Sequence, residues 1–481
     1  MATALPSPCD EASALGQGAG SCISETGTLV ATVLGSSLAF VVGSIINVAL
    51  PSMQAEFATD AGGVQWIVNA YLLPLSALVL VGGSLGDHYG RKRLFMLGLA
   101  IFTAATIGCA LAPNLEMLLV ARFAQGVGAA FLAPNSLAII ADGFRGEKRG
   151  KAVGTWAAAG AIAGAAAPVI GGFVIDNLDW RWAFAIVIPP AAAAWIVGQR
   201  SIRESRESAE ERAPLDLTGA ALATAALGTL VFALINLPER GARDAAVLAS
   251  ASAGIAFSAA FFIVERRKKG EAMMPLGIFG SMSFSGISIL TLMLYAALGG
   301  LMVLLPYMLI EGLEYSATAA GAALLPFPLI MGVLSRTMGG LATRIAIRVT
   351  LTIGPLLVAC GFGLFALMAN ADLDYWSDIL PGLITIAVGM ALCVAPLTTA
   401  VMNAVENRYV GVASGINNAI SRIAGLVATA LLGFVLIGTG GGDADLISGF
   451  ASASWVGAML AAASAGAAFA MIREESVRED A

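Results

Sequence analysis

Ionisable side chains gather at one seam between two apolar runs of this 481-residue sequence. The stretch VGGSLGDHYGRKRLFMLGL, residues 81–99, contains Asp87, His88, Arg91, Lys92 and Arg93. Gly83, Gly86 and Gly90 lie among them and permit a tight turn and close backbone approach. A carboxylate in such a turn can stabilise the free N–H groups at the amino end of a helix. We therefore expect a charged hairpin between two helices, with partners on a neighbouring helix end.

Two further cations lie deep inside apolar runs. Arg122 and Arg422 are about 10 Å and about 18 Å along their predicted helices at roughly 1.5 Å per residue. A charged side chain at such a depth is costly and by default indicates function. A structural arginine satisfied by carbonyl groups is the alternative for Arg122. For Arg422, which is near Asn417 and Asn418, interhelical hydrogen bonding is favoured over cavity lining.

The elements that must hold these groups are apolar helices. Hydrophobic residues make up 58% of the chain, charged residues make up 12%, and the mean hydropathy is +0.85. A membrane helix needs about 20 apolar residues, because its backbone groups must be satisfied inside the segment. The sequence therefore predicts an all-α membrane protein of about fourteen spans, near residues 27–50, 63–86, 94–112, 115–141, 150–175, 182–199, 217–237, 245–264, 283–310, 317–343, 349–370, 379–403, 410–437 and 447–472.

The distribution of Lys and Arg predicts the orientation of these spans. With the amino end inside, the inner gaps and the carboxyl tail carry twenty of the 26 Lys and Arg residues. The outer gaps carry only three, Arg181, Arg240 and Arg243. Since cytoplasmic loops retain Lys and Arg, both termini are expected in the cytoplasm. Residues 1–26 lack the cationic start and apolar core of a signal peptide and are predicted to be a cytoplasmic tail.

Several classes of function are disfavoured. The five cysteines show no CxxC spacing, and the single histidine excludes a histidine-rich metal site. No GxxxxGK loop is present, so direct use of a nucleotide is not predicted. The net charge of −6 does not indicate nucleic-acid binding. We therefore predict no cofactor, no metal, no nucleic-acid partner and no catalytic residues.

A second copy of the charged hairpin indicates an internal duplication. Residues 82–92 (GGSLGDHYGRK) align with residues 338–348 (MGGLATRIAIR), which places Leu85 over Leu341 and Lys92 over Arg348 at an offset of 256 residues. Both copies end a helix on the predicted cytoplasmic side. Related halves with a basic hairpin at the same place are typical of duplicated membrane transporters.

These motifs resemble those of the major facilitator superfamily, and specifically of its fourteen-span drug/proton antiporter branch. GSLGDHYGRK (83–92) is similar to the family's loop between helices 2 and 3, with His88 where arginine is usual. LLVARFAQGVGAA (118–130) is similar to its fourth-helix arginine motif. GTWAAAGAIAGAAAPVIGG (154–172) is similar to its fifth-helix antiporter motif, with Ala163 and Ala167 in place of two glycines. INVALP (46–51), WRWAF (180–184) and GVASGINNAISRIAG (411–425) add resemblance at the level of the branch.

The resemblance implies a major facilitator fold, in which two six-helix bundles enclose a cavity and two inserted helices are added. The expected domains are a cytoplasmic tail (1–26), an N-terminal six-helix bundle (27–199), a linker with two inserted helices (200–270), a C-terminal six-helix bundle (271–472) and a second tail (473–481).

The resemblance also implies roles for individual residues. The hairpin would act as a latch that contacts the opposite bundle in the outward-facing state and releases in the other, through Gly83, Asp87, Gly90, Arg91 and Arg93. Loop charges that only hold the topology are the alternative. Arg122, with Gln125 of the same motif, is assigned to proton coupling or cavity electrostatics. The antiporter motif, which accompanies export in the family, comprises Gly154, Pro168, Gly171 and Gly172.

Small residues in the antiporter motif let helices approach closely, and Pro168 permits a bend. Candidate cavity residues on other helices are Asn47, Trp66, Tyr71 and Asn135, for which packing is an equally good role.

One departure from the branch bears on substrate charge. All 32 Asp and Glu residues fall in tails, loops or helix ends, and Val42 occupies the position of the branch's first-helix aspartate. Without a deep counter-ion, a neutral, zwitterionic or anionic substrate is expected rather than a lipophilic cation.

The expected function is export of small amphipathic compounds across the inner (cell) membrane by a monomer that alternates access and is coupled to protons. Two alternatives stay open, namely a dedicated exporter of one metabolite and a non-transporting membrane sensor of the same fold.

Overall fold

The computed structural model describes residues 24–206, 215–268, 272, 274–341, 346–369, 373–406, 409–432 and 443–472. These residues are mostly helical and contain no strand, which confirms the predicted all-α class. Most of the two predicted tails, and residues 342–345 of the second hairpin copy, lie outside the described residues.

The described helices form an N-terminal half, an inserted pair and a C-terminal half. The N-terminal half comprises α2 (Glu25–Phe57), α3 (Ala61–Tyr89), α4 (Arg91–Ala110), α5 (Leu115–Gly143), α6 (Gly146–Asn177), α7 (Trp180–Ala185) and α8 (Ile188–Ser201). The inserted pair is α9 (Leu217–Arg240) and α10 (Ala245–Lys268). The C-terminal half comprises η2 (Leu276–Gly280), α11 (Met282–Glu311), α12 (Ala317–Ala323), α13 (Pro326–Leu341), α14 (Ile347–Met368), η3 (Tyr375–Ile379), α15 (Leu380–Asn403), α16 (Val410–Leu431) and α18 (Asp443–Met471).

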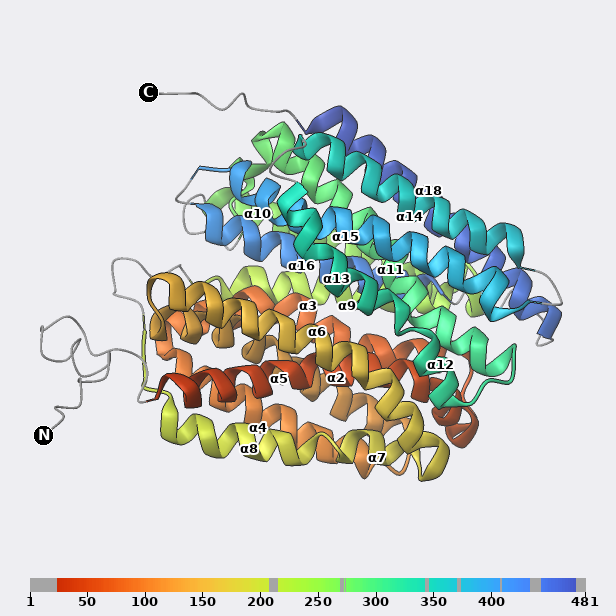
Figure 1. Cartoon of the computed structure of the whole chain (residues 1–481), viewed down its shortest axis with the longest axis horizontal. Coiled ribbons are helices and arrows are strands. Elements are labelled where there is room, and N and C mark those ends of the chain that lie inside the picture. Colours follow the sequence, from red (N-terminus) through yellow and green to blue (C-terminus); the bar gives the residue numbers. More distant parts are fainter. Residues whose placement is uncertain are drawn as a thin grey trace, which may run out of the picture.

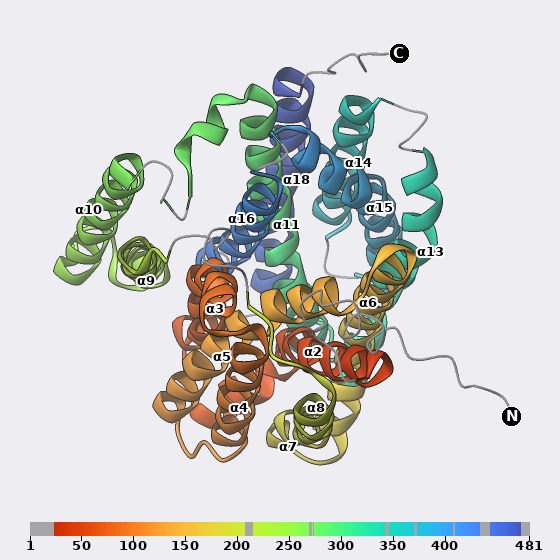
Figure 2. The ribbon, with the colours of Figure 1, turned by 90° about the vertical axis from the view of Figure 1, so that its left-hand side faces the viewer.

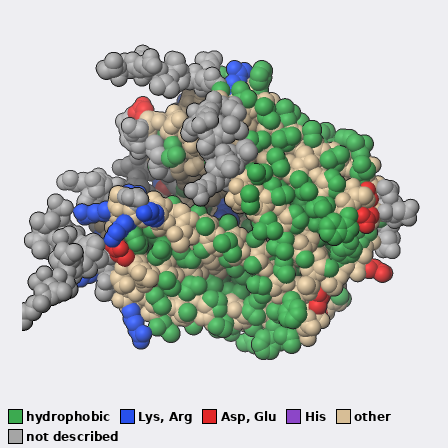
Figure 3. Space-filling view, in the orientation of Figure 1, with side chains coloured by type: hydrophobic (Ala, Val, Ile, Leu, Met, Phe, Trp, Pro, Cys, Tyr) green, Lys and Arg blue, Asp and Glu red, His purple; other side chains and the backbone are tan. Residues whose placement is uncertain are grey.

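The two halves lie one above the other, with their helices along the long axis of the molecule (Figure 1). Turned by 90°, the molecule shows α9 and α10 at its side, next to α3 and α16 (Figure 2). Apolar side chains cover much of the outer surface along the helices (Figure 3), as expected for a surface that faces lipid. The end with the α3–α4 turn at Gly90 is called the hairpin end below, and the end with the α6–α7 turn is called the far end.

Thirteen helical segments in the described part of the chain are long and apolar enough to cross a membrane. The remaining predicted span corresponds to α16, whose 22 residues include Asn417, Asn418 and Arg422. Two predicted spans are each broken into two helices, α7 with α8 and α12 with α13. Prolines lie at both breaks, at the start of α8 and at Pro326, the first residue of α13. Proline has no backbone N–H to donate within a helix, so it is tolerated in the first turn and favours a new helix start there.

Equivalent glycine contacts in the two halves support the predicted duplication. A Cβ added to Gly98 on α4 would lie 2.9 Å from the carbonyl oxygen of Gly128 on α5. A Cβ added to Gly354 on α14 would likewise lie 2.8 Å from the carbonyl oxygen of Gly389 on α15. Gly98 and Gly354 are separated by the same 256 residues as the two hairpin copies. The third and fourth helices of each half therefore meet through close backbone contacts.

Candidate transport cavity and gates

A cavity of about 480 Å³ lies between the two halves. Its volume falls in the range of small-molecule sites. The two halves meet at the far end and diverge toward the hairpin end, where the space-filling view shows a hollow between them (Figures 1 and 3). Most lining side chains are apolar, and the polar ones are Asn47, Tyr71, Arg122, Tyr295, Ser421, Arg422 and Thr429.

Arg122 lines this cavity although its exposed fraction is 0%. Its Nε donates to the carbonyl oxygen of Ile67 at 3.1 Å, and its Nη1 donates to Gln125 Oε1 at 2.7 Å. Gln125 Nε2 in turn donates to Thr106 Oγ1 at 2.8 Å. The guanidinium carbon lies 4.5 Å from the centre of the Tyr71 ring, which gives the cation an aromatic face.

In the part of the chain that the structure describes, the hydrogen-bond network of Arg122 includes no carboxylate. Arg122 Nη2 is buried without a hydrogen-bond partner among the described residues. A buried charge is costly unless it is paired, so this nitrogen is a donor whose hydrogen-bonding capacity is unused in the described residues. Arg122 is thus held by backbone and side-chain oxygens, as the structural alternative expected, while it also faces the cavity.

Arg422 comes from the opposite half and lines the same cavity. Its guanidinium carbon lies 5.9 Å from the centre of the Phe40 ring. It forms no ion pair with the described part of the chain. Asn417 makes the interhelical hydrogen bond that the sequence suggested for this segment, because Thr291 Oγ1 donates to its Oδ1 at 2.7 Å.

The other candidate cavity residues divide into two groups. Asn47 and Tyr71 line the cavity. Trp66 instead packs against the apolar cluster between α3, α9 and α16, with its ring 6.2 Å from that of Phe232. Asn135 is buried between α3 and α5, where its Nδ2 donates to the carbonyl oxygens of Gly82 and Phe131 at 2.9 and 2.8 Å. Trp66 and Asn135 thus lie between helices outside the cavity lining, and Gln125 is connected to the cavity through its hydrogen bond with Arg122.

The position of Val42 corrects part of the substrate argument. Val42 has an exposed fraction of 0% in the core and does not line the cavity, whereas its neighbour Gly43 does. A carboxylate at position 42 would thus not face the cavity directly in this conformation. The described residues that line the cavity include two arginines and no Asp or Glu.

The charged hairpin is organised around Arg91. Its guanidinium group binds Asp87 of α3, with Nε to Oδ1 at 2.9 Å, and also binds Asp142 near the end of α5. These two partners belong to the same half as Arg91. Salt bridges of Arg91 therefore tie together α3, α4 and α5 at the hairpin end.

The amino end of α4 is capped from the linker. Glu204 accepts hydrogen bonds from the backbone N–H groups of Lys92 and Arg93 at 3.0 and 3.1 Å, and its carboxylate lies 3.6 Å from Arg93 Nε. Gly90, with φ of +113°, makes the turn that exposes these groups, and a Cβ there would lie 2.4 Å from Glu204 Oε1. The predicted carboxylate at a helix amino end is present, but it comes from Glu204 and not from the hairpin.

The glycines of the hairpin differ in their contacts. A Cβ on Gly83 would lie 3.5 Å from Pro134, an ordinary contact, so the close approach predicted there is wrong. Gly86, which was also predicted, does make a close approach, because a Cβ on it would lie 1.7 Å from the side-chain Oδ1 of Asn135. Gly82, which was not predicted, makes a close approach to backbone, because its Cβ would lie 2.3 Å from the Ala130 carbonyl oxygen.

The antiporter segment on α6 makes the closest contact between the halves at the far end. A Cβ on Gly172 would lie 2.3 Å from the carbonyl oxygen of Ala317 on α12. A Cβ on Gly321 of α12 would lie 2.3 Å from the carbonyl oxygen of Pro168. Gly171 packs within its own half against Ile45. Small residues thus bring the backbones of α6 and α12 into contact.

Asp176 completes this contact and was not among the predicted site residues. Its Oδ1 accepts from Ala317 N–H at 2.9 Å, and its Oδ2 accepts from Thr318 N–H at 2.8 Å and from the Thr318 hydroxyl. A carboxylate from one half therefore caps the first turn of a helix in the other half. A second bond between the halves at this end joins Tyr307 Oη to Gln54 Oε1 at 2.7 Å.

Gly154 behaves differently from Gly172. Gly154 is exposed near the hairpin end of α6, and no described atom lies within 4 Å of a Cβ built on it. The close helix approach predicted for this glycine is therefore absent from the described residues. Within the antiporter segment, Gly172 thus contacts the other half, whereas Gly154 makes no such contact in the described residues.

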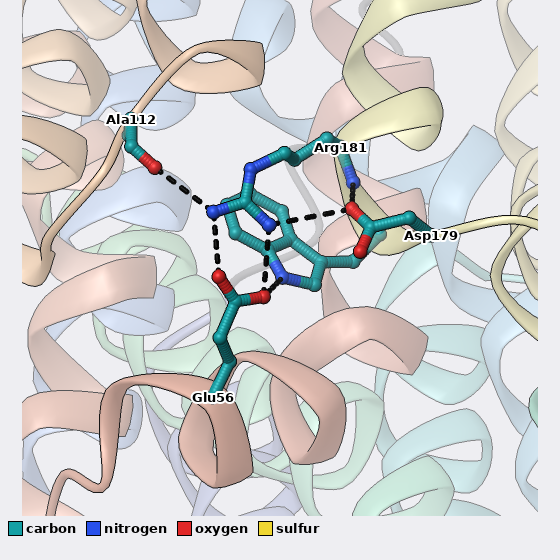
Figure 4. Close-up of polar contacts among 5 residues, drawn as sticks. Glu56, Ala112, Asp179 and Arg181 are labelled. Carbon is teal, nitrogen blue, oxygen red and sulfur yellow. Dashed lines mark hydrogen bonds and ion pairs between the residues drawn. The ribbon is translucent and has the colours of Figure 1, made fainter.

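A second missed cluster lies at the far end within the N-terminal half (Figure 4). Arg181 binds Glu56 through two bonds, Nη2 to Oε1 at 2.6 Å and Nη1 to Oε2 at 2.8 Å, and donates to the Ala112 carbonyl oxygen at 3.1 Å. Trp180 Nε1 also donates to Glu56 Oε2 at 2.6 Å, and the Arg181 guanidinium lies 4.3 Å from the Trp180 ring centre. The signal in the sequence was Arg181 itself, one of three cations on the cation-poor side.

Sequence comparisons agree with this architecture. The family model described as Major Facilitator Superfamily matches residues 32–429. The chain is 33% identical over 414 residues to the multidrug resistance protein Stp of Mycobacterium tuberculosis, covering 85% of this chain and 75% of that protein. It is 30% identical over 411 residues to the methylenomycin A resistance protein of Bacillus subtilis (85% and 87% covered) and 32% identical over 413 residues to the cephamycin export protein CmcT of Amycolatopsis lactamdurans (85% of each).

Solved structures show the same fold at low sequence identity. A peptide transporter POT in complex with sulfate superposes with a TM-score of 0.67, 15% identity and coverage of 93% of this chain and 96% of that chain. A bacterial homologue of the lysosomal transporter Spinster, in an inward-facing and unoccupied conformation, gives a TM-score of 0.66 with 16% identity and coverage of 92% and 96%. With this fold, these motifs and a family match over most of its length, the chain belongs to the major facilitator superfamily.

Proposed function

We propose that this protein exports small amphipathic compounds that are neutral, zwitterionic or anionic. The observation that carries the proposal is a cavity between the two halves with a guanidinium group from each half, Arg122 and Arg422, and no carboxylate among the described residues that line it. An anionic group would supply the acceptor that Arg122 Nη2 lacks among the described residues. Relatives named for drug resistance and antibiotic export support the direction of transport.

Transport would proceed by alternating access of residues 27–199 against residues 271–472, with residues 200–270 as linker and inserted pair. The α6–α12 contact and the Gln54–Tyr307 bond support a closed far end. With the Lys- and Arg-rich hairpin end in the cytoplasm, both termini are cytoplasmic and the conformation is inward-facing. In this state the Arg91 guanidinium would hold the hairpin to its own half through Asp87 and Asp142.

Proton antiport is part of the proposal. Asp87 and Asp142 share Arg91, so a proton on either carboxylate would weaken the bridge that orders the hairpin. Protonation would thereby shift the balance between the two conformations, because the hairpin would make different contacts in each of them. The working unit would be a monomer in the cell membrane, since each chain contains a complete cavity.

A dedicated exporter of one metabolite is the second candidate. It is favoured by the 32% identity to a protein named for cephamycin export. The two candidates differ in breadth, so a single accepted compound among many tested would select the dedicated exporter.

Gly43 offers a test of the cavity charge. A Cβ on Gly43 would have the Tyr71 ring edge at 4.0 Å as its nearest contact, so a small side chain fits there. Gly43→Asp is expected to raise export of a cationic dye relative to an anionic dye, because it adds the missing counter-ion. Gly43→Asn is the matched neutral control. Equal effects of the two variants on the cation-to-anion ratio would refute the electrostatic proposal.

A further inference from the structure

The two helices of the inserted pair differ in how they contact the rest of the molecule. α10 lies at the periphery and packs mainly on α9, which in turn contacts α3 and α16 (Figure 2). Only 11% of the most apolar window of α10 is buried. Its last turns nevertheless contain Glu265, with an exposed fraction of 1%, against Asp216, with an exposed fraction of 3%. Two carboxyl groups are therefore buried at the hairpin end of the inserted pair, where α10 is otherwise mostly exposed.

One oxygen of each carboxyl group has ordinary donors. Asp216 caps α9, and its Oδ1 accepts from Gly219 N–H at 2.6 Å and from Lys268 Nζ at 2.5 Å. Glu265 Oε2 accepts from Met274 N–H at 2.7 Å. Met274 lies on the connection to α11, so this bond ties α10 to the start of the C-terminal half.

The remaining two oxygens lie over the same glycine, Gly219. Asp216 Oδ2 and Glu265 Oε1 are both buried without a donor in the described residues. A Cβ built on Gly219 would lie 2.9 Å from the first and 2.5 Å from the second, so both oxygens lie over this glycine. The two carboxyl groups are within hydrogen-bond reach of each other. Two carboxylate oxygens are both acceptors, so a hydrogen bond between them requires a proton on one of them.

The charge balance of the cluster leads to the same requirement. Lys268 is the cation that acts on the pair among the described residues, and it can neutralise one carboxylate. A second buried carboxylate would remain unpaired, which is costly. Burial acts to raise the pKa of Asp216, but the hydrogen bonds from Lys268 and Gly219 outweigh it and hold this pKa below its usual value. The proton of the pair therefore resides on Glu265.

We propose that Asp216 and Glu265 form a proton-binding site that holds one shared proton and releases it as the surrounding solution becomes alkaline. With the proton bound, the linker end at Asp216, the end of α10 and the segment at Met274 form one unit. After release, the two carboxylates repel each other and the α10 attachment loosens. The site lies outside the cavity, so this inference goes beyond the transport proposal.

Infrared difference spectroscopy of the purified full-length protein, recorded between acidic and alkaline buffers, tests the site directly. The wild type is expected to lose a C=O band of a protonated carboxyl group on alkalinisation. Glu265→Gln and Asp216→Asn are expected to lack this component, while Glu239→Gln, an exposed carboxylate on α9, retains it. Persistence of the full band in Glu265→Gln, or no pH-sensitive band in the wild type, would overturn the proposal.

Thermal stability gives a second readout that does not depend on transport. The folded state holds this proton at a pH where an unfolded glutamate has lost it, so stability should fall as the pH rises. Glu265→Gln keeps a side chain that can donate to Asp216 and removes the titration, so its melting temperature should depend less on pH. A pH dependence identical to that of the wild type would count against a titrating pair.

Discussion

Replacing Asp176 by Asn should open the far end of the transporter. The Asp176 carboxylate accepts from two backbone N–H groups and one hydroxyl group of α12. An asparagine has one side-chain acceptor oxygen, so at least one of these N–H groups loses its partner, and the charge at the helix amino end is also removed. Loss of a helix cap together with the helix-dipole interaction costs about 1–2 kcal/mol.

The hydrogen bonds of Asp176 to α12 stabilise the conformation in which the far end is closed relative to the conformation in which it is open. Because about 1.4 kcal/mol corresponds to a factor of ten, Asp176→Asn should raise the outward-open population roughly 5- to 30-fold. A cysteine at Met302, which lines the cavity, reports this population. Its rate of labelling by a membrane-impermeant maleimide applied from outside should rise by the same factor, in a background without the native cysteines.

Glu116→Gln is the matched control. Glu116 is an exposed carboxylate at the far end of the same half and makes no bond to the C-terminal half among the described residues. A labelling rate in Asp176→Asn equal to that of the parent would refute the assignment of Asp176 to the closed far end. An equal increase in the Glu116→Gln control would do so as well, since it would indicate a general charge effect.

Three further variants have definite expectations. Gly172→Ala should impair flux and closure of the far end, as reported by labelling of the cavity cysteine, because its Cβ would meet the Ala317 carbonyl oxygen at 2.3 Å. Gly154→Ala should be tolerated, and equal flux in the two variants would contradict a role of Gly172 in packing. Arg181→Lys should lower the free energy of unfolding by roughly 1–2 kcal/mol, since lysine cannot reproduce the two-pronged bond to Glu56, and thermal unfolding beside the exposed Arg240→Lys checks this. Arg122→Ala should destabilise by about 1–3 kcal/mol, because the Gln125 amide and the Ile67 carbonyl lose a buried donor, and a melting temperature like that of the wild type would exclude this.

The sequence predicted the architecture because membrane helices and charged loops leave strong local signals. The apolar runs predicted the spans, and the offset of 256 residues between the hairpin copies recurs at Gly98 and Gly354 in the fold. Arg122 was predicted as a site residue from its depth and from the resemblance of its motif, and it lines the cavity. These features depend on the composition of a single segment, which a sequence displays directly.

The positions that the sequence did not predict are those that depend on which face of a helix packs against which neighbouring helix. Trp66 and Asn135 are polar or amphipathic residues in spans, and nothing local distinguishes a cavity from the α9 surface or the α3–α5 contact. Glu204 and Asp176 act on helix ends more than a hundred residues away in the chain. The spacing of residues within one segment carries no information about such partners.

Flux measured in proteoliposomes with an imposed pH gradient tests the central claim most directly, using cationic, neutral and anionic dyes with the wild type and Arg122→Ala. We expect that the gradient drives neutral or anionic dyes in the wild type and that this movement is lost in the variant. Preferential movement of a lipophilic cation, undiminished in Arg122→Ala, would contradict it.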